Sequence, residues 1–242
     1  MKVELRLKDP ITPQLFAALR DAIVQTRLKP GEALSEKEIA GRFGVSRQPV
    51  REAFIKLAEL ELVEILPSRG TYVTKISVRQ VANARLVREA IESDIAASAA
   101  RLAGPDDIAA LAALVEAQQA AADTQDLALF ETRDAAFHSA IADIVACDFA
   151  WRTVETARFQ TDRVRRLSLP STSPLPRLIA QHKLVAAAIA QRDPDAARAA
   201  MRRHLREILI ALPRIAAASP DYFSDTVLPA HTRDLVPEDV PV

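Results

Sequence analysis

The placement of glycine restricts the fold of this chain more than any other feature of its sequence. All five glycines lie at or before Gly104, and the alanine-rich segment from residue 105 to residue 242 contains none. Because glycine is a residue that often ends or interrupts a helix, such a segment is predicted to be helical. The first 76 residues differ, since they combine four of the glycines with β-branched stretches. We therefore expect two structurally different parts.

The length and composition indicate a globular protein. The chain has 242 residues, enough for two domains, with 49% hydrophobic and 26% charged residues. No apolar run approaches the ~20 residues that a membrane span needs, and the first residues lack the apolar core of a signal peptide. Cys147 is the single cysteine, which excludes a disulfide framework and favours a reducing compartment. A cytoplasmic protein without membrane contact is expected.

The charge is divided unevenly between the two parts. The formal net charge is zero, which by itself argues against a nucleic-acid partner. Residues 1–76, however, carry 13 Lys and Arg against 10 Asp and Glu, whereas residues 77–242 carry 19 against 22. This asymmetry is a weak indication that the first part meets a polyanion.

Residues 1–76 follow the order of a winged helix-turn-helix. The sequence predicts helices over 11–27, from Ser35 to about Phe43 and over 47–60, followed by the strands "LVEIL" and "TYVTKI", which "PSRG" joins. Ser35 with Glu38 forms a capping box, and Ser46 is expected to cap the third helix. Pro49 falls in the first turn of that helix, where its missing N–H costs nothing. This order of elements defines a winged helix-turn-helix.

The remainder of the chain predicts an all-α antiparallel helical bundle. Helices are expected over 77–104, 105–123, 125–145, 149–167, 176–191 and 194–212. Pro213 is expected to interrupt the last helix, and the tail with its four prolines should be irregular. The predicted fold class is therefore mostly α. The predicted domains are a winged helix-turn-helix over 1–76, an all-helical domain over 77–217, to which a family resemblance described below assigns effector binding and dimerisation, and an irregular tail over 218–242.

One face of the predicted third helix carries side chains suited to reading DNA. In a helix-turn-helix the second helix of the motif enters the major groove. Arg47, Gln48 and Arg51 lie opposite its apolar stripe, and arginine pairs with guanine and glutamine with adenine. Lys37 is placed to reach phosphate or a groove edge, and Arg69 at the wing tip can enter the minor groove. The alternative is that these residues are ordinary solvated charges.

Residues 28–73 closely resemble the DNA-binding domain of the GntR family of bacterial transcription regulators. The pieces that carry the resemblance are "PGEALSEKEIA", "FGVSRQPVREA" and "RGTYV". The resemblance implies double-stranded DNA as the partner. It places the family's DNA contacts on Lys37, Ser46, Arg47, Gln48, Arg51, Arg69 and Gly70. Relatives more often have arginine at the first of these positions, and lysine keeps the charge but loses the planar fork.

The histidines of the second part form a candidate metal site. Three of the four histidines lie on three different predicted helices, and Asp134 stands one helical turn before the first of them. Taken singly, each is expected to be a core histidine or a modest helix pair. Together, Asp134, His138, His182 and His204 offer three nitrogens and one oxygen, a set that suits zinc, nickel, manganese or iron.

Residues of about 77–215 resemble the all-helical effector domain of the FadR-type GntR regulators, known as the FCD domain. The matching pieces include "DAAFHSAIA" at 134–142 and "QHKLVAAAIAQRD" at 181–193. In metal-binding members the ligands fall on Asp134, His138, His182 and His204, and zinc is favoured. The family's effector-binding arginine corresponds to Arg88, for which a surface ion pair with Glu92 is the alternative. Six predicted helices, not seven, favour the VanR-like branch.

The resemblance implies a homodimeric repressor that reads a palindromic operator. Four protein ligands leave metal positions open for a small organic acid, and an arginine would bind the rest of its carboxylate. Binding of that acid is expected to release repression. One alternative is a metalloenzyme domain fused to a DNA-binding domain, since the same ligands could activate water. No separate general base or nucleophile stands out, however, and Cys147 has no matched partner. A structural metal, or no metal, is the other alternative.

Overall fold

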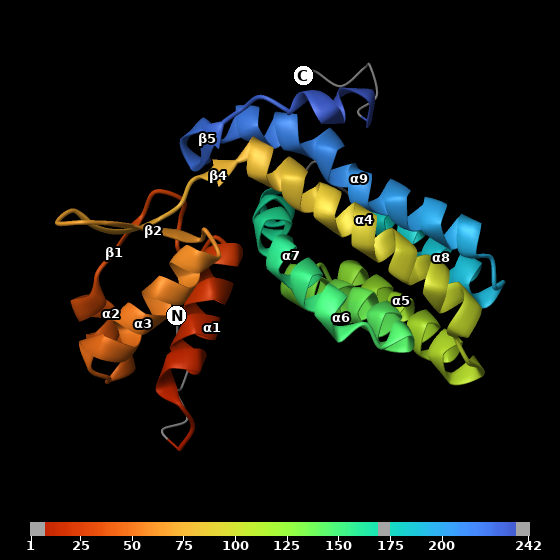
Figure 1. The fold of residues 1–242 in the computed structure, drawn as a ribbon, viewed down its shortest axis with the longest axis horizontal. Helices are drawn as coiled ribbons and strands as arrows, with labels where there is room; N and C mark the ends of the chain where they lie inside the picture. Colours follow the sequence, from red (N-terminus) through yellow and green to blue (C-terminus); the bar gives the residue numbers. More distant parts are fainter. Residues whose placement is uncertain (1–7, 169–174, 236–242) are drawn as a thin grey trace. The chain divides into compact units, whose positions relative to one another are not determined.

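The computed structural model describes residues 8–168 and 175–235 of the chain. It divides into two compact units, one up to Val78 together with Ala216–Thr226, the other from Arg79 to Ile215 with the residues from Val227 onward. The first unit combines helices with a small sheet and the second contains a helical bundle (Figure 1). The predicted mostly α fold class is confirmed.

The first unit contains the predicted helix-turn-helix and its wing. Its elements are α1 (Ile11–Val24), β1 (Ala33–Leu34), α2 (Glu36–Phe43), α3 (Arg47–Glu59), β2 (Val63–Leu66), β3 (Gly70–Val73) and β4 (Ile76–Ser77). The three-stranded sheet has the order β1-β3-β2, and both pairings are antiparallel. Strand β1 is not among the elements that the sequence predicted. Its two residues pair with the wing strand β3, a long-range contact that the local sequence does not reveal.

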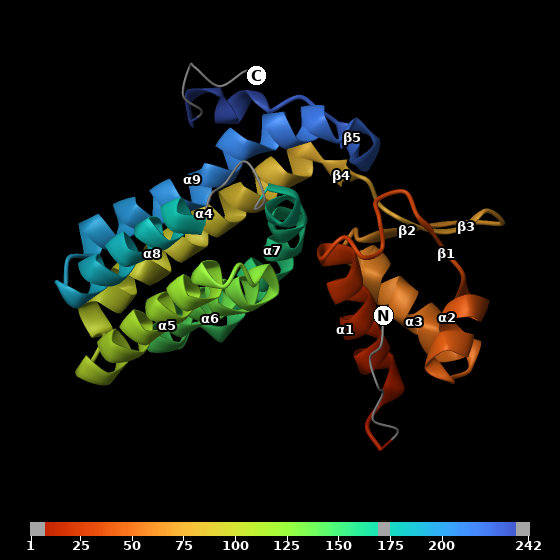
Figure 2. The same cartoon turned by 180° about the vertical axis from the view of Figure 1, so that it is seen from behind.

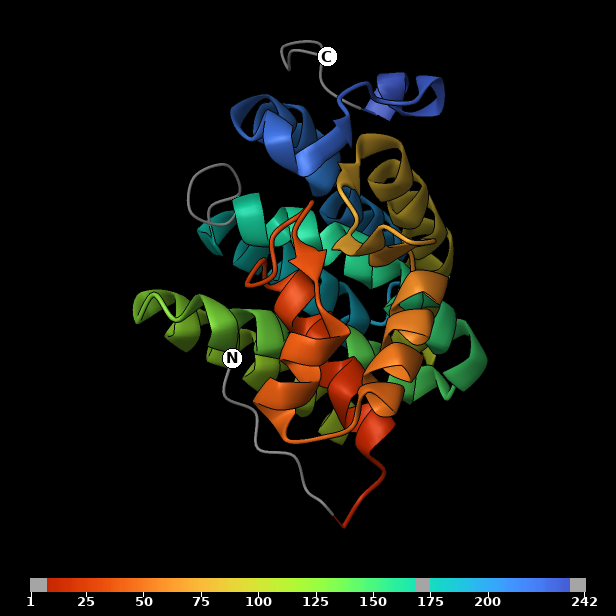
Figure 3. The same ribbon diagram turned by 90° about the vertical axis from the view of Figure 1, so that its left-hand side faces the viewer.

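The core of this unit joins the apolar stripes of α1 and α3. Helices α1, α2 and α3 pack together (Figure 3). The apolar stripe of α3 is buried and consists of Val50, Ala53, Phe54 and Leu57, which recur at helical spacing. Leu15, Leu19 and Ile23 on α1 are fully buried as well. Burial of these two stripes fixes which face of α3 remains exposed to solvent.

The two predicted serine caps behave differently. The side chain of Ser35 accepts a hydrogen bond from the Glu38 backbone N–H at 3.3 Å, as a cap should. Ser46 occupies the N-cap position of α3, but its side chain makes no capping hydrogen bond. The capping prediction is therefore wrong for Ser46. The physical reason is Pro49, which stands three residues after the cap and lacks the N–H that the hydroxyl would accept.

Gly44 is expected to be required for the turn between α2 and α3. It ends α2 with a φ of +65°, a left-handed conformation that strains any residue with a Cβ. Gly44→Ala should lower the free energy of unfolding by about 1–2 kcal/mol. Gly41 lies inside the same helix, and a Cβ there would meet no atom within 4 Å. Gly41→Ala should therefore raise the free energy of unfolding by ~0.5–1 kcal/mol. Chemical denaturation measures both changes, and changes of the same sign would contradict this account of the turn.

The second unit is built from six α-helices within the described residues. They are α4 (Val78–Leu102), α5 (Pro105–Asp123), α6 (Leu127–Val145), α7 (Asp148–Ser168), α8 (Leu175–Ala190) and α9 (Pro194–Ala218). Helices α4 and α9 run side by side, and α5 packs against both α6 and α8 (Figures 1 and 2). Alanines on α4, among them Ala96, Ala99 and Ala100, are fully buried in this core and allow close helix packing. No helix in the described part of the chain has the length and apolar character needed to cross a membrane.

The end of the chain differs from the sequence prediction in two respects. Helix α9 continues through Pro213 to Ala218, so the expected interruption at Pro213 is wrong. Leu212, Ile215 and Ala216 around it are buried, and this packing offsets the lost backbone hydrogen bond. The tail, expected to be irregular, forms two 3₁₀ helices, η1 (Pro220–Tyr222) and η2 (Ala230–Leu235), and the strand β5 (Phe223–Asp225) in its described part. Strand β5 pairs in parallel with β4.

Candidate metal centre and DNA-reading face

The four residues singled out in the second unit meet in its interior. Asp134 and His138 come from α6, His182 from α8 and His204 from α9. Each offers a ligand atom, and these atoms all lie within 4.8 Å of one another. The Nε2 atom of His204 is 3.2 Å from Nε2 of His138 and 3.2 Å from Nε2 of His182. None of the four residues is more than 2% exposed, so this is a buried cluster and not a surface ion pair.

The Nδ1 atom of each imidazole, which faces away from the cluster, has its own hydrogen-bond partner. Nδ1 of His138 lies 2.6 Å from Oε2 of Glu92 on α4. Because the pKa of Glu92 is held far below its usual range by Arg88 and His138, despite burial, the carboxylate is ionised and can only accept. His138 therefore donates from Nδ1, and its Nε2, which carries the lone pair in the neutral imidazole, faces the cluster.

The other two imidazoles are oriented by glutamine side chains. Nδ1 of His182 lies 2.6 Å from Oε1 of Gln118, and Nδ1 of His204 lies 3.1 Å from Oε1 of Gln181. The amide nitrogen of Gln181 donates to Glu207, and that of Gln118 donates to a backbone carbonyl, so each amide oxygen faces its histidine. Both imidazoles then donate from Nδ1. The Nε2 atoms of all three histidines consequently face the centre of the cluster.

This geometry fits a metal ion. Oδ1 of Asp134 is buried and has no hydrogen-bond partner among the described residues. Three nitrogen lone pairs and a carboxylate oxygen at such short separations repel one another unless a cation lies between them. Burial lowers the pKa of His182 to about 3 and that of His204 well below its usual range, so both stay neutral, as ligands must. The donor set suits a divalent transition metal.

Two arginines of α7 compensate the charge of Asp134. Burial would raise the pKa of this carboxyl, but Arg165 at 2.5 Å and Arg158 at 3.4 Å help to hold it well below the usual range. Both arginines contact Oδ2. Asp134 is therefore ionised, and its second oxygen, Oδ1, remains available on the side of the histidines.

Arg88, the candidate effector-binding residue, is buried beside the cluster. Its Nε donates to Glu92 at 2.6 Å and its Nη1 to Thr161 at 3.2 Å, while Nη2 has no partner in the described part of the chain. The ion pair with Glu92 exists, but the alternative of a surface charge is wrong because Arg88 is 2% exposed. A cavity of about 20 Å³ adjoins Arg88, lined also by Arg85, Thr161, Arg165, Ser168, Leu178, His204, Leu205, Glu207 and Ile208.

Sequence reasoning missed the residues that surround the four candidate ligands. Gln118, Gln181, Arg158 and Arg165 come from three helices and carry no motif of their own. Glu92 was read only as the helical partner of Arg88, yet it also orients His138. Helical spacing gave the first contact, since the two residues are four apart, but nothing local indicated the second contact with α6.

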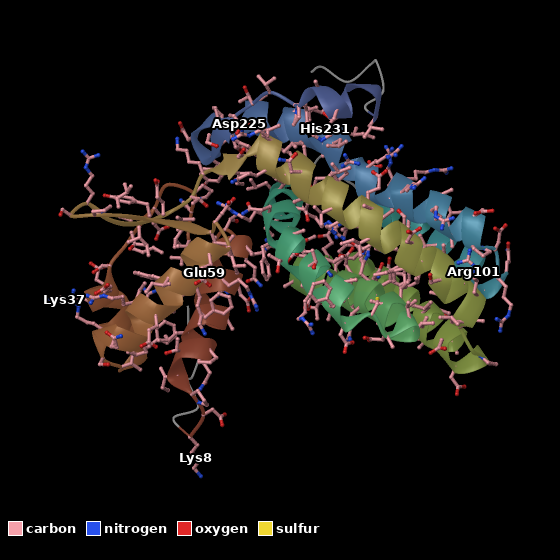
Figure 4. All side chains as sticks on the ribbon, in the orientation of Figure 1. Lys8, Lys37, Glu59, Arg101, Asp225 and His231 are labelled. Atoms are coloured by element: carbon pink, nitrogen blue, oxygen red, sulfur yellow. The ribbon has the colours of Figure 1, made fainter. Side chains whose placement is uncertain are left out.

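The candidate DNA-contacting residues are all exposed residues of the first unit. They are Lys37, Ser46, Arg47, Gln48, Arg51, Arg69 and Gly70. Figure 4 shows Lys37 on α2, directed away from the unit. Arg47 and Arg51 both form ion pairs with Glu36 at the start of α2, at 3.2 Å and 2.9 Å. The structure thus brings the two arginines together, and Ser46 keeps its hydroxyl free of a capping bond.

The wing presents Arg69 at its tip. Its backbone N–H donates to Leu66, and the backbone carbonyl of Arg69 accepts a hydrogen bond from the Tyr72 hydroxyl at 2.9 Å. Gly70 follows with a φ of +108°, a conformation that favours glycine. The backbone at the wing tip is therefore held by its own hairpin, while the Arg69 side chain stays exposed.

A winged helix-turn-helix and a helical bundle with a buried cluster of metal-ligand side chains together define a DNA-binding transcription regulator. Residues 11–73 match the family of bacterial regulatory proteins called gntR, and residues 84–207 match the FCD domain. The chain belongs to the GntR family and carries an FCD domain. This is a family of transcription regulators and not of enzymes, and its members bind DNA through the helix-turn-helix.

Relatives of this chain match it over almost its whole length. The HTH-type transcriptional repressor RspR of Escherichia coli (strain K12) is 41% identical over 227 residues, which cover 93% of this chain and 100% of RspR. An HTH-type transcriptional regulator in an unstable DNA locus of Streptomyces ambofaciens is 37% identical and covers 87% of this chain and 88% of the relative. The solved structure of E. coli McbR/YncC has a TM-score of 0.73 and 23% identity, over 88% of this chain and 99% of that chain. That likeness shows a shared fold.

Proposed function

We propose that this protein is a metabolite-responsive transcription repressor that senses a small carboxylate at a metal-containing pocket. The observation that carries the proposal is the convergence of three imidazole lone pairs and Asp134 Oδ1 in the interior of the second unit. The adjoining cavity is lined by three arginines, which suit a carboxylate. The 41% identical relative is itself a repressor, which supports the same sign of regulation for this chain.

The proposed DNA contacts follow from the exposed face of α3 and its surroundings. Arg47, Gln48 and Arg51 read bases in the major groove, and Lys37, Ser46, Arg69 and Gly70 contact phosphate or the minor groove. Because each subunit offers one such face, a homodimer reads the two halves of a palindromic operator. The bundle, residues 77–217, provides dimerisation and effector binding. We place the protein in the cytoplasm, where its DNA target lies.

Zinc is the favoured metal, with nickel, manganese or iron as other candidates for the same ligands. Asp134, His138, His182 and His204 hold the metal, and a divalent ion supplies an electrophilic centre for a carboxylate oxygen. Arg88 binds the remaining carboxylate oxygen through its unpartnered Nη2. The six helices in the described part of the second unit support the VanR-like branch of the FadR-type regulators.

The effector acts by binding one arrangement of the protein more tightly than another. A ligand shifts a conformational equilibrium only through this difference in affinity. In the proposed mechanism, the arrangement that binds the acid has the lower affinity for the operator. By linkage, operator DNA then lowers the affinity of the protein for the acid by the same factor.

A thermal-shift screen of small carboxylates, with and without chelator, tests the proposed function. An effector should raise the midpoint of thermal unfolding by mass action, and chelator should abolish the rise. An acid that stabilises the protein in this chelator-dependent way should also release it from the upstream DNA of its own gene in a gel shift. Stabilisation that persists in chelator would show that the pocket binds its acid without metal.

A further inference from the structure

Arg85 lines the same cavity as Arg88 but is not accounted for by the proposed function. It lies three residues earlier on α4 and is 1% exposed. Its Nη1 pairs with Glu89. Its Nε and Nη2 are buried and have no hydrogen-bond partner among the described residues, whereas Arg88 has a single such nitrogen. Two unsatisfied nitrogens on one buried guanidinium are costly unless an acceptor reaches them.

The charge of Arg85 is also only partly compensated. Glu89, its one carboxylate partner among the residues that the structure describes, is shared with Arg206, so a single negative charge serves two guanidinium groups. Burial lowers the pKa of Arg85 in spite of Glu89. Arg88 shows the opposite balance, because Glu92 outweighs burial and raises its pKa. One carboxylate at Arg85 therefore serves two guanidinium groups, and Glu207, which also lines the cavity, pairs with Arg177.

A water molecule does not remove this deficit. The cavity of about 20 Å³ has room for one water, which can accept hydrogen bonds but carries no charge. Arg85 and Arg88 are three residues apart on one helix, so their Cβ atoms are about 5–6 Å apart. Because both side chains line the same cavity, a ligand with a carboxylate at each end can meet both guanidinium groups. Such a ligand needs lining side chains to change rotamer, which is common on binding.

We propose that the effector is a short-chain dicarboxylate, with one carboxylate at Arg88 and the candidate metal centre and the other at Arg85. This inference rests on the proposed function and names its ligand class. Arg85 acts as the specificity-determining residue, because a monocarboxylate would leave its two nitrogens without an acceptor. The preference for diacids over monoacids should then depend on this one side chain.

The test compares acids of equal chain length with zinc-loaded protein by isothermal titration calorimetry. Succinate is paired with butanoate, and malate with 2-hydroxybutanoate. The wild-type protein should bind each diacid at least about tenfold more tightly than its monoacid partner. Arg85→Met should bind both members of a pair alike, with the monoacid affinity within about twofold of wild type. Arg85→Gln, which keeps a donor without the charge, repeats the comparison if Arg85→Met does not fold.

Arg206→Met is the matched control. It removes the other guanidinium that shares Glu89, but Arg206 does not line this cavity, so the preference for diacids should remain. Equal affinity of the wild type for both classes, or loss of the preference in Arg206→Met as well, would overturn the inference. If monoacids bind as tightly as diacids and chelator abolishes both, this inference fails alone. If neither class binds, the proposed carboxylate-sensing function fails with it.

Discussion

Protein in which His182 and His204 are both replaced by alanine is expected to lack stoichiometric metal and to respond to chelator no more than a metal-free protein. Wild-type protein purified without a histidine tag should contain about one divalent ion per chain and should unfold about 10 °C lower after chelation. The reason is mass action: a metal present far above its dissociation constant stabilises the folded state by about 4 kcal/mol. Elemental analysis and thermal unfolding with and without chelator measure both effects.

His231→Ala is the control for this prediction. His231 is the remaining histidine, exposed on η2, where Figure 4 labels it, and it is not one of the four clustered residues. This variant should keep the metal and the full response to chelator. A double variant that retains stoichiometric metal would place the ion somewhere other than the four residues proposed. A wild-type protein without metal under metal-replete conditions would leave the convergent lone pairs unexplained and would contradict the proposal.

Replacing Arg51 or Arg47 by alanine is expected to weaken operator binding by about 1–3 kcal/mol for each residue. Both side chains are exposed at the start of α3, and in helix-turn-helix proteins the start of this helix contacts the bases. In the free protein both bind Glu36, so they must exchange a carboxylate for DNA when the complex forms. Gel shifts with the upstream region of the protein's own gene, at fixed salt concentration, measure the loss.

Lys56→Ala separates base reading from general attraction to DNA. Lys56 is exposed on the same helix, but it lies about 180° around the helix axis from Arg47. The substitution Lys56→Ala therefore removes one positive charge from a different face of the helix. Its effect should be small. An equal loss of affinity in all three variants would indicate that charge alone binds the DNA. Wild-type affinity in both arginine variants would show that α3 does not read the operator.

The sequence predicted the helix-turn-helix well because its signals are local. The stripe of α3 is visible from residue spacing, and Ser35 marks the start of α2 through a bond to a residue three positions away. The predictions that failed depend on contacts between residues distant in the sequence, or on one local preference overriding another. Strand β1 exists because β3 pairs with it, and Pro49 removes the N–H that Ser46 was expected to cap. Helix α9 continues beyond Pro213 because the residues around the proline are packed in the core.

For the candidate metal centre, the sequence could supply the four residues but not their surroundings. The chain has so few histidines that three of them on separate helices already predicted a common site. Asp134 could be added because it shares a helix face with His138. The partners of the imidazoles, Gln118 and Gln181, are ordinary helical residues until the bundle packs. Their role depends on distances between helices, which no local pattern encodes.

The cluster draws on all six α-helices in the described part of the second unit. Asp134 and His138 come from α6. Each remaining α-helix of the bundle contributes at least one residue to the cluster or its surroundings, among them Glu92 (α4), Gln118 (α5), Arg165 (α7), His182 (α8) and His204 (α9). The proposed ion would therefore link all the helices of the bundle, directly or through the residues that orient its ligands. A change in the coordination of the ion would shift the positions of all six helices. By linkage, a distant substitution that moves any one of these helices would alter the affinity for the metal.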